Sequence, residues 1–189
     1  MNDIKVGFCI CGSFCTIDKA LAQMQKLSTK YDILPIVSEI VTKTDTRFGK
    51  AEEILKKIED ICNKKVIKSI PDAEPIGPKN MTDIMIIAPA TGNTIAKLSN
   101  GIIDNTVTMA AKSHLRNSRP LVIAPCTNDA LGGAAKNIGK LLNYKNYYFV
   151  PFSQDDHKLK PKSMVAHFDK IDETIELALK GIQIQPIIS

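Results

Sequence analysis

The stretch DIMIIAPATGN, residues 83–93, decides the fold of this chain, because it joins a buried strand to a polar turn. Its first half is a continuous apolar run, as expected for a strand buried on both faces of a parallel sheet. Its second half supplies Thr91, Gly92 and Asn93, small polar residues at the point where a helix should begin. The pattern returns in PLVIAPCTN, residues 120–128. The repetition predicts two parallel strands, each ended by its proline, with similar polar chemistry at their carboxyl ends.

Apolar runs and helical patterns alternate along the rest of the chain. Strands are expected in KVGFCI (5–10), ILPIVS (33–38), KKVIKSI (64–70) and YYFVPF (147–152). Helices are expected over residues 17–27, 51–62, 93–113, 133–142 and 169–180. The third helix should break near Gly101, and Asp169 and Gly181 should cap the last one. This alternation predicts the α/β class: a single Rossmann- or flavodoxin-like domain, residues 1–189, with a parallel sheet and helices on both faces. Residues 71–80, which contain three prolines, and the polar residues 153–163 are expected as flap loops.

Composition narrows the class of function. The chain has 189 residues and a net charge of +5, and its lysines are scattered rather than grouped with aromatic residues, so nucleic acid is not the expected partner. No signal peptide is expected at the N-terminus, and no apolar run has the length expected of a membrane span, so a cytoplasmic protein is expected. In that compartment the five cysteines should be reduced.

The segment CGSFCT, residues 11–16, follows the first predicted strand and can be read in two ways. Gly12 and Ser13 before a helix start are typical of a phosphate-binding turn, although a plain tight turn explains them equally well. Cys9 and Cys11 are two residues apart on a strand and lack the spacing of a zinc site, so we interpret them as core residues and Cys15 as a turn residue. No metal site is expected.

Polar side chains at the other strand ends complete the predicted pocket. Ser38 closes the second strand, and the two Ala-Pro turns contribute Thr91, Gly92, Asn93, Thr127 and Asn128. These groups could line one crevice at the carboxyl edge of the sheet, or the threonines could serve only as helix caps. A pocket of amides, hydroxyls and backbone groups without a carboxylate pair suits an aromatic, phosphate-bearing cofactor that carries the hard chemistry.

The segment APATGNTIAKLSNGIIDN, residues 88–105, closely resembles a motif of the FMN-binding flavoproteins, a family that includes the cysteine decarboxylases. GSFCT, Ser38 and APCTN stand where that family has a phosphate loop, a serine and a P-x-M-N motif. The resemblance implies that FMN is held by Gly12, Ser13, Ser38, Thr91, Gly92, Asn93 and Thr127, with Asn93 and Asn128 as candidate catalytic residues. It also implies a homo-oligomer, a trimer or a multiple of one.

Most of the chain is similar to one branch of that family, through PIVSEIVTKTDTRFGKAE, AEPIGPKN, TNDALG and YFVPFSQDD. That branch implies a sporulation protein of the mother cell. It would act with a separate NAD(P)-dependent subunit to make pyridine-2,6-dicarboxylate from a dihydrodipicolinate-type precursor. Cations are needed to hold a dicarboxylate, and Arg47 is the candidate, with Lys112, Lys162 and His157 as further choices.

The chain also departs from the decarboxylases. Pro75 stands where they have a catalytic histidine, and PCTNDALGG lacks the tryptophan of their P-x-M-N-x-x-M-W motif. Three functions therefore remain: an FMN-containing enzyme subunit, a non-catalytic stabilising partner with a vestigial pocket, and a decarboxylase that uses a substitute for the histidine.

Overall fold

The computed structural model describes residues 4–188, which form one α/β domain around a seven-stranded sheet. The strands are β1 (Lys5–Ile10), β2 (Asp32–Val37), β3 (Ile84–Ala90), β4 (Leu121–Thr127), β5 (Tyr147–Phe149), β6 (Phe152–Gln154) and β7 (Met164–Ala166). The first five are mutually parallel and run in the order β2-β1-β3-β4-β5. This is the flavodoxin-like order, in which the chain reverses its direction of winding between β1 and β3.

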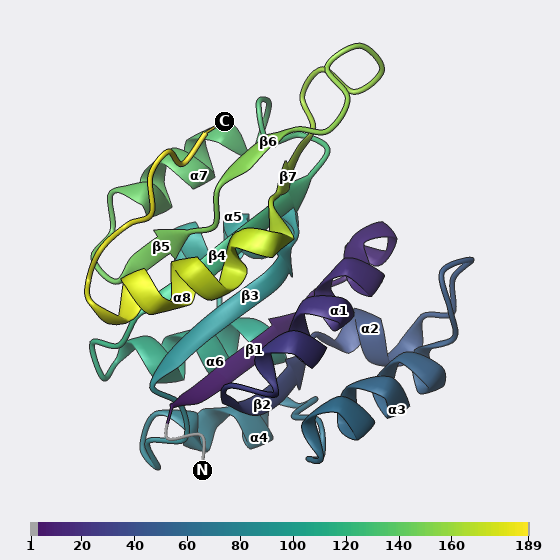
Figure 1. Cartoon of the computed structure of the whole chain (residues 1–189), viewed down its shortest axis with the longest axis vertical. Coiled ribbons are helices and arrows are strands. Elements are labelled where there is room, and N and C mark those ends of the chain that lie inside the picture. The colour runs from purple at the N-terminus through teal and green to yellow at the C-terminus, as the bar shows by residue number, and fades with distance from the viewer. Residues whose placement is uncertain (1–3, 189) are drawn as a thin grey trace.

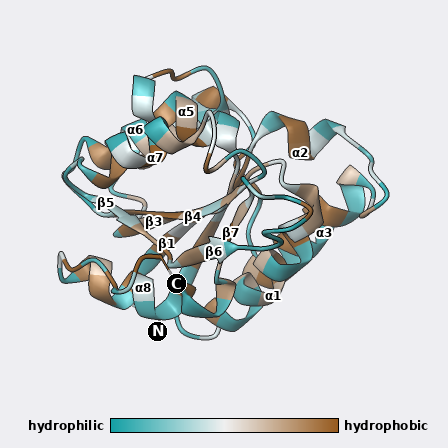
Figure 2. Ribbon diagram, turned by 90° about the horizontal axis from the view of Figure 1, so that it is seen from above, coloured by the Kyte–Doolittle hydropathy of each residue, from teal (hydrophilic) through white to brown (hydrophobic). Residues whose placement is uncertain are grey.

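Helices cover both faces of the sheet, as predicted (Figure 1). They are α1 (Ile17–Leu27), α2 (Glu39–Lys43), α3 (Ala51–Cys62), α4 (Ile70–Ala73), α5 (Gly92–Asn100), α6 (Thr106–Leu115), α7 (Ala135–Leu142) and α8 (Ile171–Leu179). Seen from above, α5, α6 and α7 lie on one side of the sheet, while α1 and α8 lie on the other (Figure 2). The strands between the layers are the most apolar part, and every residue of β3 is buried.

The sheet is not wholly parallel, and here the prediction needs correction. The predicted strand YYFVPF is two strands, β5 and β6, separated by Val150 and Pro151. β6 and β7 form an antiparallel hairpin, and β7 pairs with the end of β4. The predicted flap over residues 153–163 includes the tip of this hairpin, which projects from the body (Figure 1).

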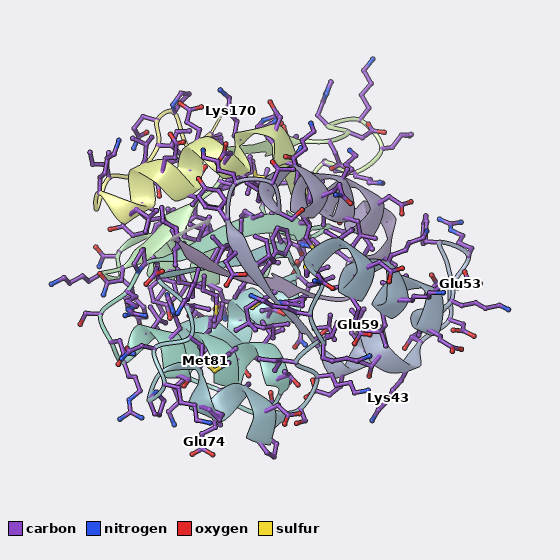
Figure 3. The ribbon with its side chains drawn as sticks, turned by 60° about the horizontal axis from the view of Figure 1, so that its bottom comes forward. Lys43, Glu53, Glu59, Glu74, Met81 and Lys170 are labelled. Carbon is purple, nitrogen blue, oxygen red and sulfur yellow. The ribbon has the colours of Figure 1, made fainter. Side chains whose placement is uncertain are left out.

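The prediction of a flap loop over residues 71–80 needs correction, because residues 71–76 are helical and only residues 77–80 form a turn. Ser69 caps α4 by accepting a hydrogen bond from the Asp72 amide, and a 3₁₀ turn, Glu74–Ile76, follows. Pro71 and Pro75 fall in the first turn of these two elements, where a missing N–H costs nothing, and Pro78 lies in the turn that follows. The inner side packs against α6, while Glu74 points away from the body (Figure 3). The segment precedes β3 and so lies at the amino edge of the sheet, away from the polar strand ends.

Other local predictions also need correction. Pro89 and Pro125 do not end their strands, since β3 continues to Ala90 and β4 to Thr127, with a shift in register between Ile87 and Ala90. KKVIKSI forms only an isolated bridge, between Ile67 and Ile36. Asp169 does not cap α8, because the cap position is Lys170, whose side chain makes no capping hydrogen bond.

Gly181 ends α8 as predicted, because its φ of 76° is the left-handed conformation that a helix C-terminus favours. The chain beyond it runs along the outer edge of β5 and β6. The Gln183 side chain accepts a 2.7 Å hydrogen bond from the Phe149 amide and donates one of 2.7 Å to the Phe149 carbonyl. The Phe152 amide donates to the Ile187 carbonyl at 2.9 Å. The tail thus fills the hydrogen-bonding positions of a missing neighbour strand.

Candidate functional site

A cleft of about 610 Å³ opens at the carboxyl edge of the sheet. Residues that follow β1, β2 and β3 line it, together with the start of α6. This position is the reversal point between β1 and β3, where open α/β sheets bind their ligands. The volume lies within the range of small-molecule and cofactor sites.

Four predicted site residues line this cleft: Gly12, Ser38, Thr91 and Asn93. A side chain at Gly12 would place its Cβ 2.7 Å from a methyl group of Ile40, so the turn after β1 passes close under α2. Thr91 caps α5 by accepting a 3.3 Å hydrogen bond from the Thr94 amide. The two interpretations of Thr91, as a helix cap and as a cleft residue, are therefore both correct.

Ser38 is the most informative of these residues. It is 8% exposed, and its hydroxyl oxygen is buried without a hydrogen-bond partner among the described residues. A buried hydroxyl without a partner costs free energy, because it has lost its water and gained nothing in return. The hydroxyl therefore has no bond to give up if it turns toward a molecule in the cleft.

The charged side chains of the cleft were missed by the sequence analysis. The Glu39 carboxylate accepts from the Thr106 amide at 2.9 Å and from the Thr106 hydroxyl at 2.7 Å, so it neutralises the start of α6. The Lys97 ammonium lies 2.7 Å from the Asp104 carboxylate. Every charged side chain lining the cleft thus has an internal partner.

Asn105 was also missed, although the motif that carried the family resemblance ends on it. Its side-chain oxygen accepts a hydrogen bond from the Thr108 amide at 2.9 Å, and the Asn105 backbone amide donates one to the Thr108 hydroxyl at 3.3 Å. This capping box fixes the start of α6 against the cleft. The signal was present in the spacing of Asn105 and Thr108.

The second Ala-Pro turn lies beside the cleft rather than in its wall. The Thr127 hydroxyl donates a 2.5 Å bond to Asp129, and a Cβ on Gly92 would fall 2.7 Å from the same hydroxyl. The two turns are therefore neighbours, as predicted from the repeat, but Gly92, Thr127 and Asn128 do not line the cleft. Asn128 is exposed and accepts from the Ser163 hydroxyl at 3.3 Å.

Ser13 and the candidate cations also lie outside the cleft wall. The Ser13 hydroxyl accepts from the Thr16 hydroxyl at 3.0 Å within the turn. Arg47 is exposed between α2 and α3, with its guanidinium 4.8 Å from the Phe48 ring. His157 and Lys162 belong to the projecting hairpin, and Lys112 lies on α6 beside a different groove.

The cysteines occupy the places that the sequence predicted. Cys9 and Cys11 are buried, and Cys15 is exposed. Burial raises the pKa of the Cys9 thiol, and it raises the pKa of Cys11 to about 11, although the Thr94 hydroxyl donates to the Cys11 sulfur at 3.3 Å. Cys11 therefore forms part of the cleft floor as a neutral thiol.

Neither a metal-ligand cluster nor a membrane-spanning helix occurs in the part of the chain that the structure describes. Between residues 4 and 188, no three His, Cys, Asp or Glu side chains are placed to hold a metal ion. Over the same residues, no helix combines the length and the apolar character needed to cross a bilayer.

Comparison with known proteins identifies the family. The family model described as Flavoprotein matches residues 1–177. The chain is 46% identical over 185 residues to the B subunit of dipicolinate synthase from Bacillus subtilis, a match that covers 97% of this chain and 92% of that protein.

Solved structures agree with this result. The crystal structure of the B subunit of dipicolinate synthase from Bacillus halodurans superimposes with a TM-score of 0.91 at 44% identity, covering 100% of this chain and 98% of that one. The FMN-dependent cysteine decarboxylase SpaF shares the fold, with a TM-score of 0.67 at 21% identity over 95% of this chain and 97% of its own. Because the family model covers residues 1–177 and the 46% identity extends over 97% of the chain, the chain belongs to the flavoprotein family and is a homologue of the B subunit of dipicolinate synthase.

Proposed function

We propose that this chain is the B subunit of a dipicolinate synthase and holds FMN in the cleft between β1 and β3. With an NAD(P)-dependent A subunit it would form pyridine-2,6-dicarboxylate from a dihydrodipicolinate-type precursor, in the cytoplasm of a sporulating mother cell. The identity of 46% over nearly the whole chain supports the enzyme assignment. The unpartnered hydroxyl of Ser38 is the single observation that supports an occupied cleft.

The described residues fit FMN. The cleft has room for a flat aromatic group, and Gly12 keeps the turn after β1 free of a side chain. The Asn93 amide, in the first turn of α5, has no partner within its helix and can donate to an anion in the cleft. Lys97, the cation among the described cleft residues, is paired, so the phosphate would be held by amide and hydroxyl donors rather than by a lysine.

Each cleft residue then has a role of its own. Ser38 and Thr91 would donate hydroxyl hydrogen bonds, and the Asn93 amide would bond a polar edge of the bound group. Bound FMN supplies redox chemistry or an electron sink. Cys11, as a neutral thiol under the cleft, adds shape without charge. Asn128 and Arg47 lie outside the cleft wall, so they would contact substrate only if a loop movement or a second protomer brought them next to it.

The A subunit is proposed to contribute the groups that this cleft lacks. Glu39, Lys97 and Asp104 are all engaged in internal bonds, so none is free to move a proton or to hold a substrate carboxylate. A homo-oligomer, a trimer or a multiple of one, is part of the proposal.

The internal bonds of Glu39, Lys97 and Asp104 also favour a second candidate function, because they leave no free acid or base among the described cleft residues. This candidate is a non-catalytic partner that stabilises the A subunit. The decarboxylase alternative is weaker. Pro75 lies in the 3₁₀ turn packed beside Ser113, which is about two helical turns along α6 from the cleft.

The first experiment is a flavin titration of the purified protein, followed by visible absorbance after unbound FMN is removed. We expect the wild type to retain flavin and Ser38→Ala to bind it about tenfold more weakly, the loss expected for one good hydrogen bond. Ser28→Ala, the same change at the end of α1, is the matched control.

Dipicolinate formation is then assayed with the A subunit present. No retained flavin in the wild type would refute the FMN proposal. Full activity of the A subunit alone would refute the enzyme role and favour the stabilising partner.

A further inference from the structure

A second concave site lies between α5 and α6, separate from the cleft. It has a volume of about 370 Å³. Five apolar side chains line it: Leu98, Ile102, Ile103, Leu115 and Tyr147. The two helices lie side by side on one face of the sheet (Figure 2). We call this site the α5–α6 groove.

Two cations border the α5–α6 groove, and both lack an acidic partner among the described residues. Lys112 and Arg116 are exposed and four residues apart, at the end of α6. Within residues 4–188 neither side chain forms an ion pair, whereas Lys97 on the opposite wall is paired with Asp104. Like charges at this spacing repel each other, so the arrangement favours an anion placed between them.

The apolar lining of the groove defines the rest of the ligand. A purely inorganic anion would leave the leucine and isoleucine side chains and the Tyr147 ring without a contact. A single aromatic ring would cover them, because flat rings bury apolar area and stack on tyrosine. Residues four apart lie on one face of a helix, so the flexible side chains of Lys112 and Arg116 can each reach a carboxylate of the same ring.

We infer that the α5–α6 groove binds a single-ring aromatic dicarboxylate, with one carboxylate at Lys112 and the other at Arg116. The inference depends on the groove's own residues. It touches the proposed function only because the proposed product belongs to the same chemical class. Lys97 lines both the groove and the cleft, so the two sites share one wall.

A simpler explanation is that the two cations only balance the negative end of the α6 dipole. That explanation requires no ligand, and it can be separated from ours by a binding measurement. It predicts that their removal destabilises the protein slightly and changes no affinity.

The test is equilibrium dialysis with benzene-1,3-dicarboxylate, which has the required shape and does not chelate metals through a ring nitrogen. We expect the double variant Lys112→Gln/Arg116→Gln to bind it at least about tenfold more weakly than wild type, since two charge-assisted contacts are lost. Lys136→Gln/Lys140→Gln removes two exposed lysines with the same spacing on α7 and is the matched control. The neutral diamide of the same ring should not bind.

Ser38→Ala completes the design, because it alters the cleft and leaves the groove intact. Unchanged dicarboxylate affinity in Ser38→Ala supports the groove as the site. Loss of affinity in Ser38→Ala alone would place the ligand in the cleft and overturn the inference. It would also be overturned by no binding at millimolar concentration, by equal affinity in the double variant, or by an acidic peptide binding where the dicarboxylate does not.

Discussion

At the scale of single residues, the cleft combines groups that are satisfied with one that is not. Asn105, Glu39 and Lys97 all have partners, whereas the Ser38 hydroxyl has none within residues 4–188. Functional sites commonly carry such a local cost, which the rest of the fold compensates. Ser38 is therefore the position where stability and binding should respond to mutation in opposite directions.

Removing the Ser38 hydroxyl should stabilise the flavin-free protein. An unpartnered buried hydroxyl costs about 1–3 kcal/mol, so Ser38→Ala should raise the free energy of unfolding by about 1 kcal/mol. This change in the free energy of unfolding is measured by urea unfolding of the flavin-free wild type, Ser38→Ala and the control Ser28→Ala. A clear loss of stability in Ser38→Ala would mean that the hydroxyl has a partner in solution.

His114 predicts a dependence of stability on pH. It is 1% exposed; its Nε2–H donates to the Pro120 carbonyl at 2.9 Å, and its Nδ1 accepts from the Thr82 hydroxyl at 2.8 Å. Burial lowers the pKa of His114 from 6.5 to about 4, because the charged form would lose its water. The unfolded chain therefore takes up a proton first as the pH falls.

The stability from neutral His114 should be complete above pH 6.5 and disappear as the pH falls from 6.5 to about 4, a change of about 3 kcal/mol. The free energy of unfolding, measured across this interval, should slope less in His114→Gln. His157→Gln removes an exposed histidine at the hairpin tip and should keep the wild-type slope. Equal slopes in all three proteins would contradict the prediction.

Part of the site could be predicted residue by residue, because the carboxyl ends of parallel strands meet at one edge. That rule was sufficient for Gly12, Ser38, Thr91 and Asn93. It could not find Glu39, whose partner Thr106 lies 67 residues away in the sequence. Contacts of this kind depend on how helices are placed on the sheet, which a local pattern does not specify.

At the scale of elements, the segment around α4 shows where sequence rules were applied too simply. Three prolines suggested a loop, yet Ser69 and Asp72 already formed a helix-start pattern with Pro71 just inside it. Proline disrupts the interior of a helix but suits its first turn. The number of prolines was therefore a poorer guide than their positions relative to a cap.

The contact of this segment with α6 predicts a sensitive glycine. A Cβ on Gly77 would fall 2.0 Å from the Ser113 carbonyl oxygen, and the Gly77 amide donates to the Ser113 hydroxyl at 2.8 Å. Gly77→Ala should cost about 3 kcal/mol or more in unfolding free energy, because backbone must move apart. Gly139→Ala, in α7 with open space around it, should instead stabilise by about 0.5–1 kcal/mol.

Chemical denaturation of both glycine variants tests this contrast. If Gly77→Ala were as stable as the wild type, the turn at Gly77 and α6 could not be packed as closely as described. The described packing is supported if Gly139→Ala gains stability while Gly77→Ala loses stability in the same assay. A gain in Gly139→Ala without a loss in Gly77→Ala would not support it.

At the scale of the whole molecule, the parallel part of the sheet followed from the alternation of apolar runs and helical patterns. The hairpin of β6 and β7 did not, because each strand has three residues and carries too little pattern to be recognised. The direction of a short strand depends on its partners, and here β7 pairs with the end of β4. The described fold is therefore a predicted parallel core with an antiparallel addition.

The tail should contribute measurably to overall stability. Gln183→Ala would leave the Phe149 amide and carbonyl without partners, and Phe149 is fully buried. We expect a loss of about 2 kcal/mol in unfolding free energy. Gln25→Ala, at an exposed position of α1, should be close to neutral. Thermal and urea unfolding of the two variants decide the matter, and equal stabilities would show that the tail bonds add little.

The bonds made by Gln183 have a further consequence, for solubility. An uncovered edge strand is a template on which a strand from another molecule can add and so start an aggregate. Here the chain's own tail holds part of that template, since a side-chain amide imitates the peptide group of an incoming strand. A protein shortened before Gln183 would expose this edge, and its first failure should be self-association rather than loss of ligand binding.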